Sequence, residues 1–206
     1  MTQDRNAVSE SDSFNLVRYR ALLRVAEAIA SHADLSALVQ DLARLLPLVV
    51  PVNFVGLSLH EPRRGVMRLH ALRANVPADI IGGHESAPAD TPAGLVWETQ
   101  QPLLLRDVSA EPRWPNVIGL MREDGVQSCC LVPLTSATQR LGALEFSSRE
   151  QQAYGIADME LMQQIGRQVA VAVENVLNRE AAEASRRDVE RQRDRFSLLL
   201  RMTNTI

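Results

Sequence analysis

The sequence contains no lysine, and all 22 of its basic residues are arginines. A phosphate-binding loop of the G-x-x-x-x-G-K-[ST] type, a lysine Schiff base and a kinase-type lysine all depend on a lysine side chain. These chemistries are therefore excluded for the 206 residues of this chain. We do not expect the chain to hydrolyse nucleotides by such routes.

Several other features are scarce as well. The two cysteines, Cys129 and Cys130, are adjacent, which excludes a disulfide framework. No apolar run reaches the length of a membrane span, and the start, MTQDRNAVSESDS, lacks the apolar core of a signal peptide. A net charge of −3 gives no basic surface for nucleic acid or an anionic membrane. We expect a cytoplasmic protein whose chain contacts neither nucleic acid nor a membrane directly.

Helical periodicity marks the first part of the chain. Residues 1–13 are polar and are predicted to form a disordered lead. Apolar residues recur at helical spacing over residues 14–31 and again over residues 35–46. Asp34 is a suitable N-cap for the second of these helices, and Pro47 ends it.

Two β-hairpins are then predicted. NFVGLSLH and VMRLHALR flank EPRRG, while SCCLVPLTS and RLGALEFSS flank SATQ. In the first hairpin we expect Leu59 to pair with Met67, so that His60 and His70 are not cross-strand partners and do not form a metal site. The face opposite the apolar one would then carry a polar set: Gly56, Ser58, His60, Arg68 and His70.

Between the hairpins lies a segment rich in proline and glycine. Residues 75–92, NVPADIIGGHESAPADTP, contain three prolines and two glycines. A loop of this length in a compact domain is usually a lid, a binding loop or a disordered segment. We expect this lid to be the least ordered part of the domain. Beyond it, AGLVWETQQ and VIGLMRED predict short helices and PLLLRDV a strand.

A long helix is predicted from about Ala157 almost to the last residue. Its second half, residues 178–195, is nearly all polar, with six arginines and five acidic residues, and predicts a helical linker. Its first half has an apolar stripe that is longer than the first helix of one chain can cover. We expect the surplus to be buried against a second chain, giving a parallel homodimer. The stripe comprises Met162, Ile165, Val169, Ala172, Val173 and Val176.

The end of the chain repeats a stretch near its start. RFSLLLRMTNTI, residues 195–206, shares five identities with RYRALLRVAEAI, residues 18–29. Two generic amphipathic helices would be one explanation. A repeat cut off at the last residue instead favours residues 196–206 as the beginning of a second, truncated domain of the same kind.

Three stretches carry a resemblance to a known family. TPAGLVWETQQPLLLRDV, SCCLVPLTSATQRLGALEFSS and DMELMQQIGRQVAVAVENVLN resemble segments of GAF domains, and the resemblance covers residues 14–177. It implies an α+β fold of the GAF/profilin-like kind, with a central antiparallel sheet of about six strands. Terminal helices would cover one face of the sheet, and short helices and the lid the other.

The resemblance is greatest to the GAF domains at the front of formate-hydrogenlyase-type, sigma-54-dependent transcription activators. It implies a domain, not an enzyme, that senses an unidentified small-molecule effector and signals through dimerised terminal helices. Three alternatives remain open: a GAF sensor of a histidine kinase or cyclase, a pocketless dimerisation module, and a thiol-based redox or nitric-oxide sensor or methionine-sulfoxide-reducing enzyme.

The departures from the family pattern concern its known ligands. Cyclic-nucleotide-binding members carry Asn-Lys…Phe…Asp-Glu, where this chain has Ser148, Arg149, Tyr154, Asp158 and Met159. Bilin-binding members use a Cys-His pair, and neither cysteine here precedes a histidine. The resemblance therefore favours neither a cyclic nucleotide nor a bilin, and the cofactor is unknown.

The candidate site residues follow from the expected hairpin faces and from the segments that wall the pocket in this family. Cys129 and Cys130 are either a redox pair or two small buried residues. Core packing is the alternative role for both tryptophans, and a structural acid for Glu145. The predicted ligand-binding set is Gly56, Ser58, His70, Trp97, Trp114, Cys130 and Glu145.

Overall fold

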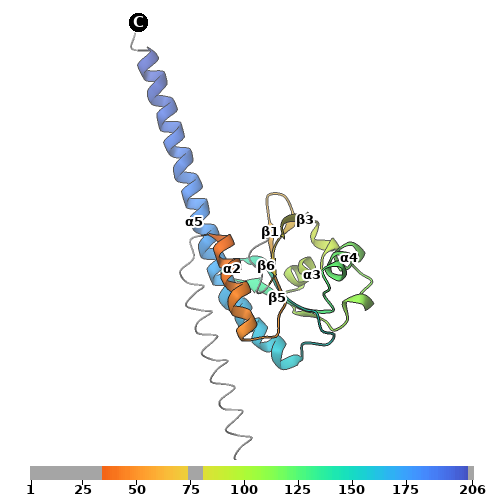
Figure 1. Ribbon diagram of the computed structural model, residues 1–206. Helices are drawn as coiled ribbons and strands as arrows, with labels where there is room; N and C mark the ends of the chain where they lie inside the picture. The colour runs from red at the N-terminus through yellow and green to blue at the C-terminus, as the bar shows by residue number, and fades with distance from the viewer. Residues whose placement is uncertain (1–33, 74–80, 204–206) are drawn as a thin grey trace, which may run out of the picture.

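The computed structural model describes residues 34–73 and 81–203, drawn as coloured ribbons in Figure 1. The predicted lead and the predicted helix over residues 14–31 lie outside this range, as do the first residues of the predicted lid. Among the described helices, none has a stretch both long enough and apolar enough to cross a membrane.

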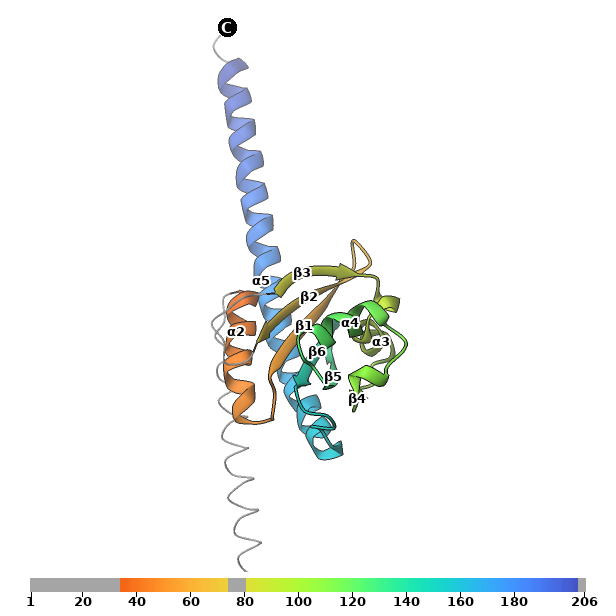
Figure 2. The ribbon, with the colours of Figure 1, turned by 45° about the vertical axis from the view of Figure 1, so that its right-hand side comes forward.

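A sheet of six strands occupies the centre of the domain (Figure 2), and its order is β3-β2-β1-β6-β5-β4. All neighbouring strands run antiparallel. This architecture confirms the expected fold class. The strands are β1 (Phe54–Glu61), β2 (Val66–Arg73), β3 (Ile81–Ser86), β4 (Leu103–Leu105), β5 (Ser128–Thr135) and β6 (Arg140–Ser148).

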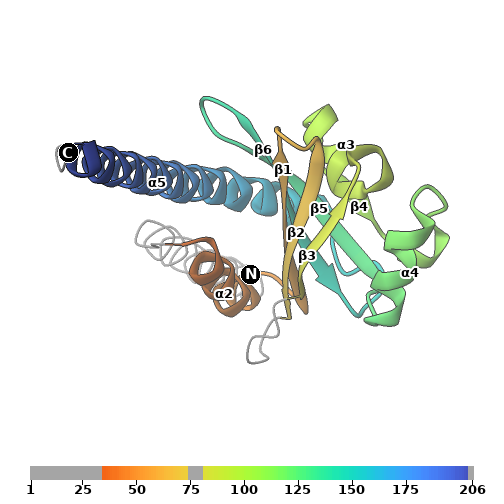
Figure 3. The ribbon, with the colours of Figure 1, turned by 90° about the horizontal axis from the view of Figure 1, so that it is seen from above.

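Helices cover both faces of the sheet. Seen from above in Figure 3, α2 (Leu35–Leu45) and the long α5 (Ile156–Thr203) lie on one side, and α3 (Pro92–Thr99) and α4 (Pro115–Glu123) on the other. We call these sides the helix face and the cavity face. Three short 3₁₀ turns complete the described chain: η1 (Leu46–Leu48), η2 (Pro88–Asp90) and η3 (Val108–Ala110).

Side-chain caps fix where α2 and α3 begin. Asp34 Oδ1 accepts a hydrogen bond from Ala37 N at 2.8 Å, as expected from the sequence. Thr91 Oγ1 accepts one from Gly94 N at 2.9 Å, and Pro92 fills the first position of α3. Each cap satisfies a backbone N–H that has no partner within its helix. The cap at Thr91 sets the start of α3 at the edge of the cavity face.

The predicted register of the first hairpin is wrong by one residue. Met67 pairs with His60 rather than Leu59. Glu61 is not part of the turn but the last residue of β1, and its carbonyl accepts hydrogen bonds from Arg64 N and Gly65 N. The loop is therefore one residue shorter than expected, with Gly65 at φ +63°. Since side chains alternate along a strand, this slip moves every β2 side chain to the opposite face.

The predicted lid contains a strand. Residues 81–86 form β3, which pairs with β2 at the edge of the sheet, and residues 88–90 form a 3₁₀ turn. Gly83 has φ +106°, and the register shifts between Arg68 and His70 where the two strands meet. Residues 81–86 thus use their backbone groups in sheet pairing, where the sequence predicted a loop. That the lid is the least ordered part of the domain stays a prediction.

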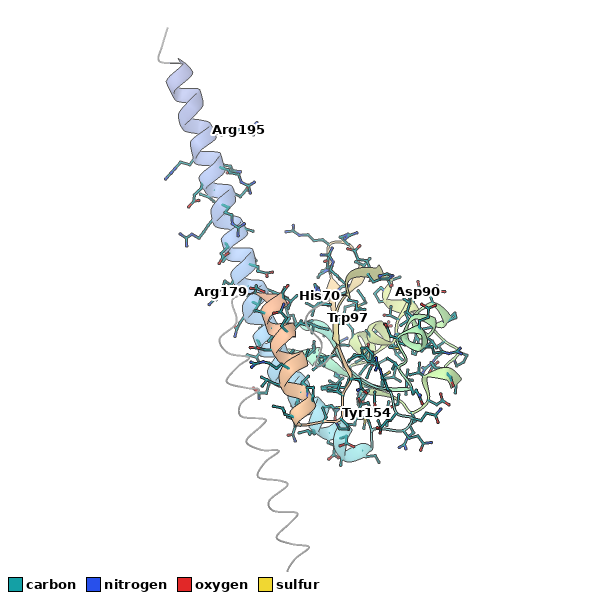
Figure 4. The ribbon with its side chains drawn as sticks, in the orientation of Figure 1. His70, Asp90, Trp97, Tyr154, Arg179 and Arg195 are labelled. Atoms are coloured by element: carbon teal, nitrogen blue, oxygen red, sulfur yellow. The ribbon has the colours of Figure 1, made fainter. Side chains whose placement is uncertain are left out.

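The two halves of α5 have opposite surroundings. The apolar stripe is buried against the sheet and α2 within one chain: Met162, Ile165, Val169 and Val173 are fully buried. The expected surplus for a second chain is therefore not there. Residues 178–193 are exposed, and the side chains between Arg179 and Arg195 stand clear of the domain (Figure 4). Within this exposed segment, Glu183 and Arg187 form an ion pair at 3.3 Å.

Candidate functional site

A cavity of about 200 Å³ lies between the cavity face of the sheet and helices α3 and α4. Its floor is made by three neighbouring strands of the sheet, β1, β6 and β5. Gly56 and Ser58 come from β1, Glu145 from β6 and Leu131 from β5. Glu145 pairs with both Gly56 and Leu131, so these three residues form one row across the sheet.

The walls of the cavity are mainly apolar and come from segments far apart in the sequence. Strand β2 contributes Met67 and Leu69, and α4 contributes an apolar row at helical spacing. A few polar groups are set among them. This composition is typical of sites that bind small molecules. The remaining wall residues are Phe54, Val55, His84, Ser86, Thr91, Pro92, Ala93, Val117, Leu120, Met121, Asp124 and Val126.

Glu145 is the carboxylate on the floor. Ser147 Oγ, fully buried, donates a hydrogen bond to its Oε1 at 2.5 Å. Burial raises the pKa of Glu145, because a charged carboxylate is poorly solvated there, and the Ser147 hydrogen bond opposes this effect. The prediction placed Glu145 as either a structural acid or a pocket group, and the structure places it in the cavity wall.

Gly56 gives Glu145 the room that it occupies. A Cβ at position 56 would lie 3.2 Å from Cβ of Glu145 and 3.3 Å from its Oε2. A side chain larger than glycine would therefore press on Glu145 or enter the cavity. The small residues at positions 56 and 58 are one reason why the sheet and the helices above it do not close the cavity.

His70 lies away from this cavity, contrary to the expected arrangement of the hairpin. Its cross-strand partner is Leu57, whose side chain is buried on the helix face. Burial and the positive charge of Arg68 lower the pKa of His70. The one-residue register slip is the cause: it places Met67 and Leu69 beside Ser58, where Arg68 and His70 were expected.

The two tryptophans lie beside the cavity but do not line it. Trp114 is buried among the core residues of the cavity face, and its Nε1 donates to the carbonyl of Ala89 at 3.3 Å. Trp97 stacks on His60 with ring centroids 3.9 Å apart, and its Nε1 donates to the carbonyl of Arg140. Both positions agree with the packing alternative for these side chains.

The cysteines are consecutive residues of β5 and so point to opposite faces of the sheet, and both are fully buried. Cys129 belongs to the core of the cavity face and Cys130 to that of the helix face. Burial raises the pKa of both thiols, that of Cys130 to about 12. These surroundings favour the interpretation as small core residues, since a reactive cysteine needs an accessible thiolate. Nowhere in residues 34–73 or 81–203 do three or more His, Cys, Asp or Glu side chains gather as metal ligands.

Sequence reasoning missed the contribution of α4. Val117, Leu120 and Met121 line the cavity, and Leu120 is exposed although it is a large apolar residue. Their i, i+3, i+4 spacing was a usable signal for one apolar helix face. That this face covers a cavity depends on where α4 lies relative to the sheet, which the sequence of α4 alone does not reveal.

Comparison with known proteins identifies relatives of the chain. Residues 24–174 match the family described as GAF domain. The "Formate hydrogenlyase transcriptional activator" of Salmonella typhimurium (strain SL1344) is 26% identical over 188 residues, covering 85% of this chain and 26% of that protein. The "DNA-binding transcriptional activator HyfR" of Escherichia coli (strain K12) is 26% identical over 165 residues, covering 76% of this chain and 24% of that protein. The chain thus spans about a quarter of the length of these relatives.

Solved structures share the fold. The GAF domain of a phosphoenolpyruvate-protein phosphotransferase from Coxiella burnetii aligns with a TM-score of 0.68 at 15% identity, covering 81% of this chain and 98% of that one. The free methionine-R-sulfoxide reductase of Neisseria meningitidis, solved with its substrate, aligns with a TM-score of 0.61 at 17% identity, covering 78% and 90%. At these identities the likeness concerns the fold alone.

Proposed function

This chain belongs to the GAF domain family, and we propose that it is a small-molecule-sensing regulatory domain of a bacterial transcriptional activator. Its similarity to the formate hydrogenlyase and HyfR activators supports the regulatory role. The observation that carries the sensory role is the cavity, because it lies on strands whose other face packs against the long helix α5.

Strand β5 connects the cavity with α5. Leu131 lines the cavity, and the next residue, Val132, lies in the core of the helix face. A Cβ on Gly166 of α5 would lie only 2.8 Å from Cγ2 of Val132, so the helix approaches the strand closely. Closely packed elements have little free volume between them. A ligand that shifts β5 would therefore shift α5 as well.

The β5–β6 turn holds α5 at a second point. Ser136 Oγ donates a hydrogen bond to Glu174 Oε1 at 3.0 Å, and Thr138 Oγ1 donates to the same oxygen. These hydrogen bonds lower the pKa of Glu174 and so favour its charged form. Glu174 lies a few residues before the exposed linker segment, residues 178–195. The turn is thus placed to pass a movement of the sheet to the start of that segment.

We also retain a homodimer in the proposal, through the exposed side of α5 instead of the buried stripe. Val171 and Val189 are 51% and 62% exposed. They are five turns of α-helix apart and so lie on the same side of the helix. Small or uncharged residues occupy this side between them, at Asn178, Ala182 and Ser185. A second copy of α5 running parallel would cover both valines.

The sensory role is tested by native mass spectrometry of the purified chain, which would detect a retained small molecule. We expect Gly56→Leu to abolish retention while the circular dichroism spectrum stays unchanged, because the leucine would enter the cavity. Gly119→Leu on α4 is the control, since a Cβ there meets nothing within 4 Å. Equal retention by both variants would place the ligand outside this cavity.

The dimer is tested by light scattering on a matched pair of variants in the linker segment. Val189→Glu puts a charge between the two helices and should give monomers. Ala184→Glu adds the same charge to the opposite, exposed side of the helix and should leave the dimer intact. A dimer that survives Val189→Glu would mean that another surface holds the copies together.

A further inference from the structure

The cavity has one unusual wall group, the carboxylate of Glu145. It comes from β6, one of the two central strands of the sheet, and lines the cavity between its cross-strand neighbours Gly56 and Leu131. Ser147 donates to Oε1. Within the described residues, no other hydrogen bond and no arginine pairs with this carboxylate. Oε2, on the side of Gly56, therefore remains available to a molecule in the cavity.

The other described wall residues include no arginine to balance the charge of Glu145, and the chain has no lysine. The guanidinium of Arg149 lies over the ring of Phe54, but Arg149 is not itself a wall residue. Among the described wall residues, His84 is the only basic side chain. Electrostatic complementarity therefore disfavours a carboxylate or phosphate ligand, which would bring a negative charge beside Glu145 without a cation to balance it.

We infer that the cavity takes a small, mainly apolar molecule carrying one protonated amine, whose ammonium group binds Glu145. The apolar part of such a molecule would lie against Leu69, Leu131 and Met121. The ammonium would donate to Oε2, so that a buried carboxylate with a single hydrogen bond gains a charged partner. This inference rests on the proposed sensory function and names its ligand class.

Burial energetics favour the same class of ligand. An isolated carboxylate in apolar surroundings is costly, and the raised pKa of Glu145 reflects this cost. An ammonium removes the cost by pairing with the charged form, whereas a neutral alcohol offers one hydrogen bond and no opposite charge. The amine is therefore expected to bind more tightly than an alcohol of the same shape.

The inference is tested with three compounds of one shape: cyclohexylamine, cyclohexanol and cyclohexanecarboxylate. Binding to the full chain at pH 7 is measured by calorimetry and by NMR shifts. We expect cyclohexylamine to bind at least tenfold more tightly than cyclohexanol, and the carboxylate not to bind measurably. Glu145→Gln keeps the shape of the side chain and should weaken amine binding at least tenfold. Glu150→Gln, at an exposed glutamate just after β6, should not.

The compound series on the unaltered chain decides the ligand class even if Glu145→Gln does not fold. Tighter binding of the alcohol or the carboxylate, or no binding of the amine, would overturn the amine inference. Unchanged amine affinity in a folded Glu145→Gln would overturn it too. The proposed function would survive if native mass spectrometry finds a retained neutral or acidic molecule that Gly56→Leu removes. If no molecule of any class occupies the cavity, both the inference and the sensory role are lost.

Discussion

The two faces of the sheet differ in how completely helices cover their side chains. On the helix face, Leu57, Leu144 and Phe146 are fully buried beneath α2 and α5. On the cavity face, the alternating residues of the same strands include Gly56, Ser58 and Glu145, and short helices span the space above them. One face is packed as a core, and the other leaves a volume for a ligand. The alternation of side chains lets one strand serve both purposes.

The largest test of this comparison uses two valines of α5. Val173 is fully buried on the helix face, whereas Val171 is 51% exposed. Val173→Glu should lower the free energy of unfolding by about 3–5 kcal/mol or prevent folding, because the glutamate would be buried without a partner. Because the proposed dimer would cover Val171, the comparison is made at a protein concentration at which the chain is monomeric, where Val171→Glu should change the free energy of unfolding by less than about 0.5 kcal/mol. Urea unfolding of both variants measures the difference.

A folded, merely monomeric Val173→Glu would contradict this account. It would mean that the buried stripe is an interface between chains, as first expected from the sequence. Equal losses in the two valine variants would show that α5 is buried on both sides.

The second test removes one leucine from each face. Leu57→Ala on the helix face should cost about 2–5 kcal/mol, since it leaves a hole in a packed core. Leu69 lines a cavity that already exists, and its side chain is partly exposed. Leu69→Ala should therefore lower the free energy of unfolding by less than about 1.5 kcal/mol. Chemical unfolding at one temperature compares them, and similar costs would mean that the cavity closes in solution.

The third test concerns pH. The pKa of Glu145 is raised in the folded chain above its ordinary value of 4.5. Between these two pKa values the folded state holds a proton that the unfolded state has lost, so stability falls as pH rises through this window. Glu145→Gln lacks this dependence, and its stability relative to the parent chain should grow by about 1.4 kcal/mol for each pH unit within the window. If the free energies of unfolding of the two proteins change in parallel with pH, the carboxylate of Glu145 is exposed to water in the folded chain.

The smallest effect is expected at the cysteines, one on each face. Both thiols are buried with raised pKa values, so modification by Ellman's reagent should be at least about a hundredfold slower than in urea. Single-cysteine variants separate the faces. Cys129 should react a few-fold faster than Cys130, because the short helices of the cavity face open more easily than α2 and α5. Fast labelling of the native chain would favour a thiol switch instead.

The sequence allowed the elements to be predicted where local signals were strong. The cap at Asp34, the two hairpins and the long α5 have local causes: a side-chain acceptor, alternating residues and helical periodicity. Glu145 could be singled out because an acid between Leu144 and Phe146 stands out in a strand, and it lines the cavity. That it binds a ligand stays a prediction.

The errors came from interactions between segments. The hairpin register depended on whether Glu61 ends β1 or starts the turn, and a charged residue before proline favoured the turn. Strand β3 contains two glycines, and the sequence just before it contains a proline, so its pairing with β2 was not visible locally. The cavity was predicted only in part, because α4 reaches it through tertiary packing, which its own sequence does not determine.

The unbroken course of α5 has a mechanical consequence. Its residues 178–203 continue the helix beyond the packed half, a distance of roughly 40 Å at about 1.5 Å per residue. A stiff bar of that length magnifies motion: a tilt of about 5° at its base displaces its far end by roughly 3.5 Å. Small rearrangements around a ligand, of the order of one bond length, would thus become displacements large enough to change contacts at the far end. Residues 178–193 are exposed, so no other part of the described domain packs against this half of the helix and opposes such a tilt.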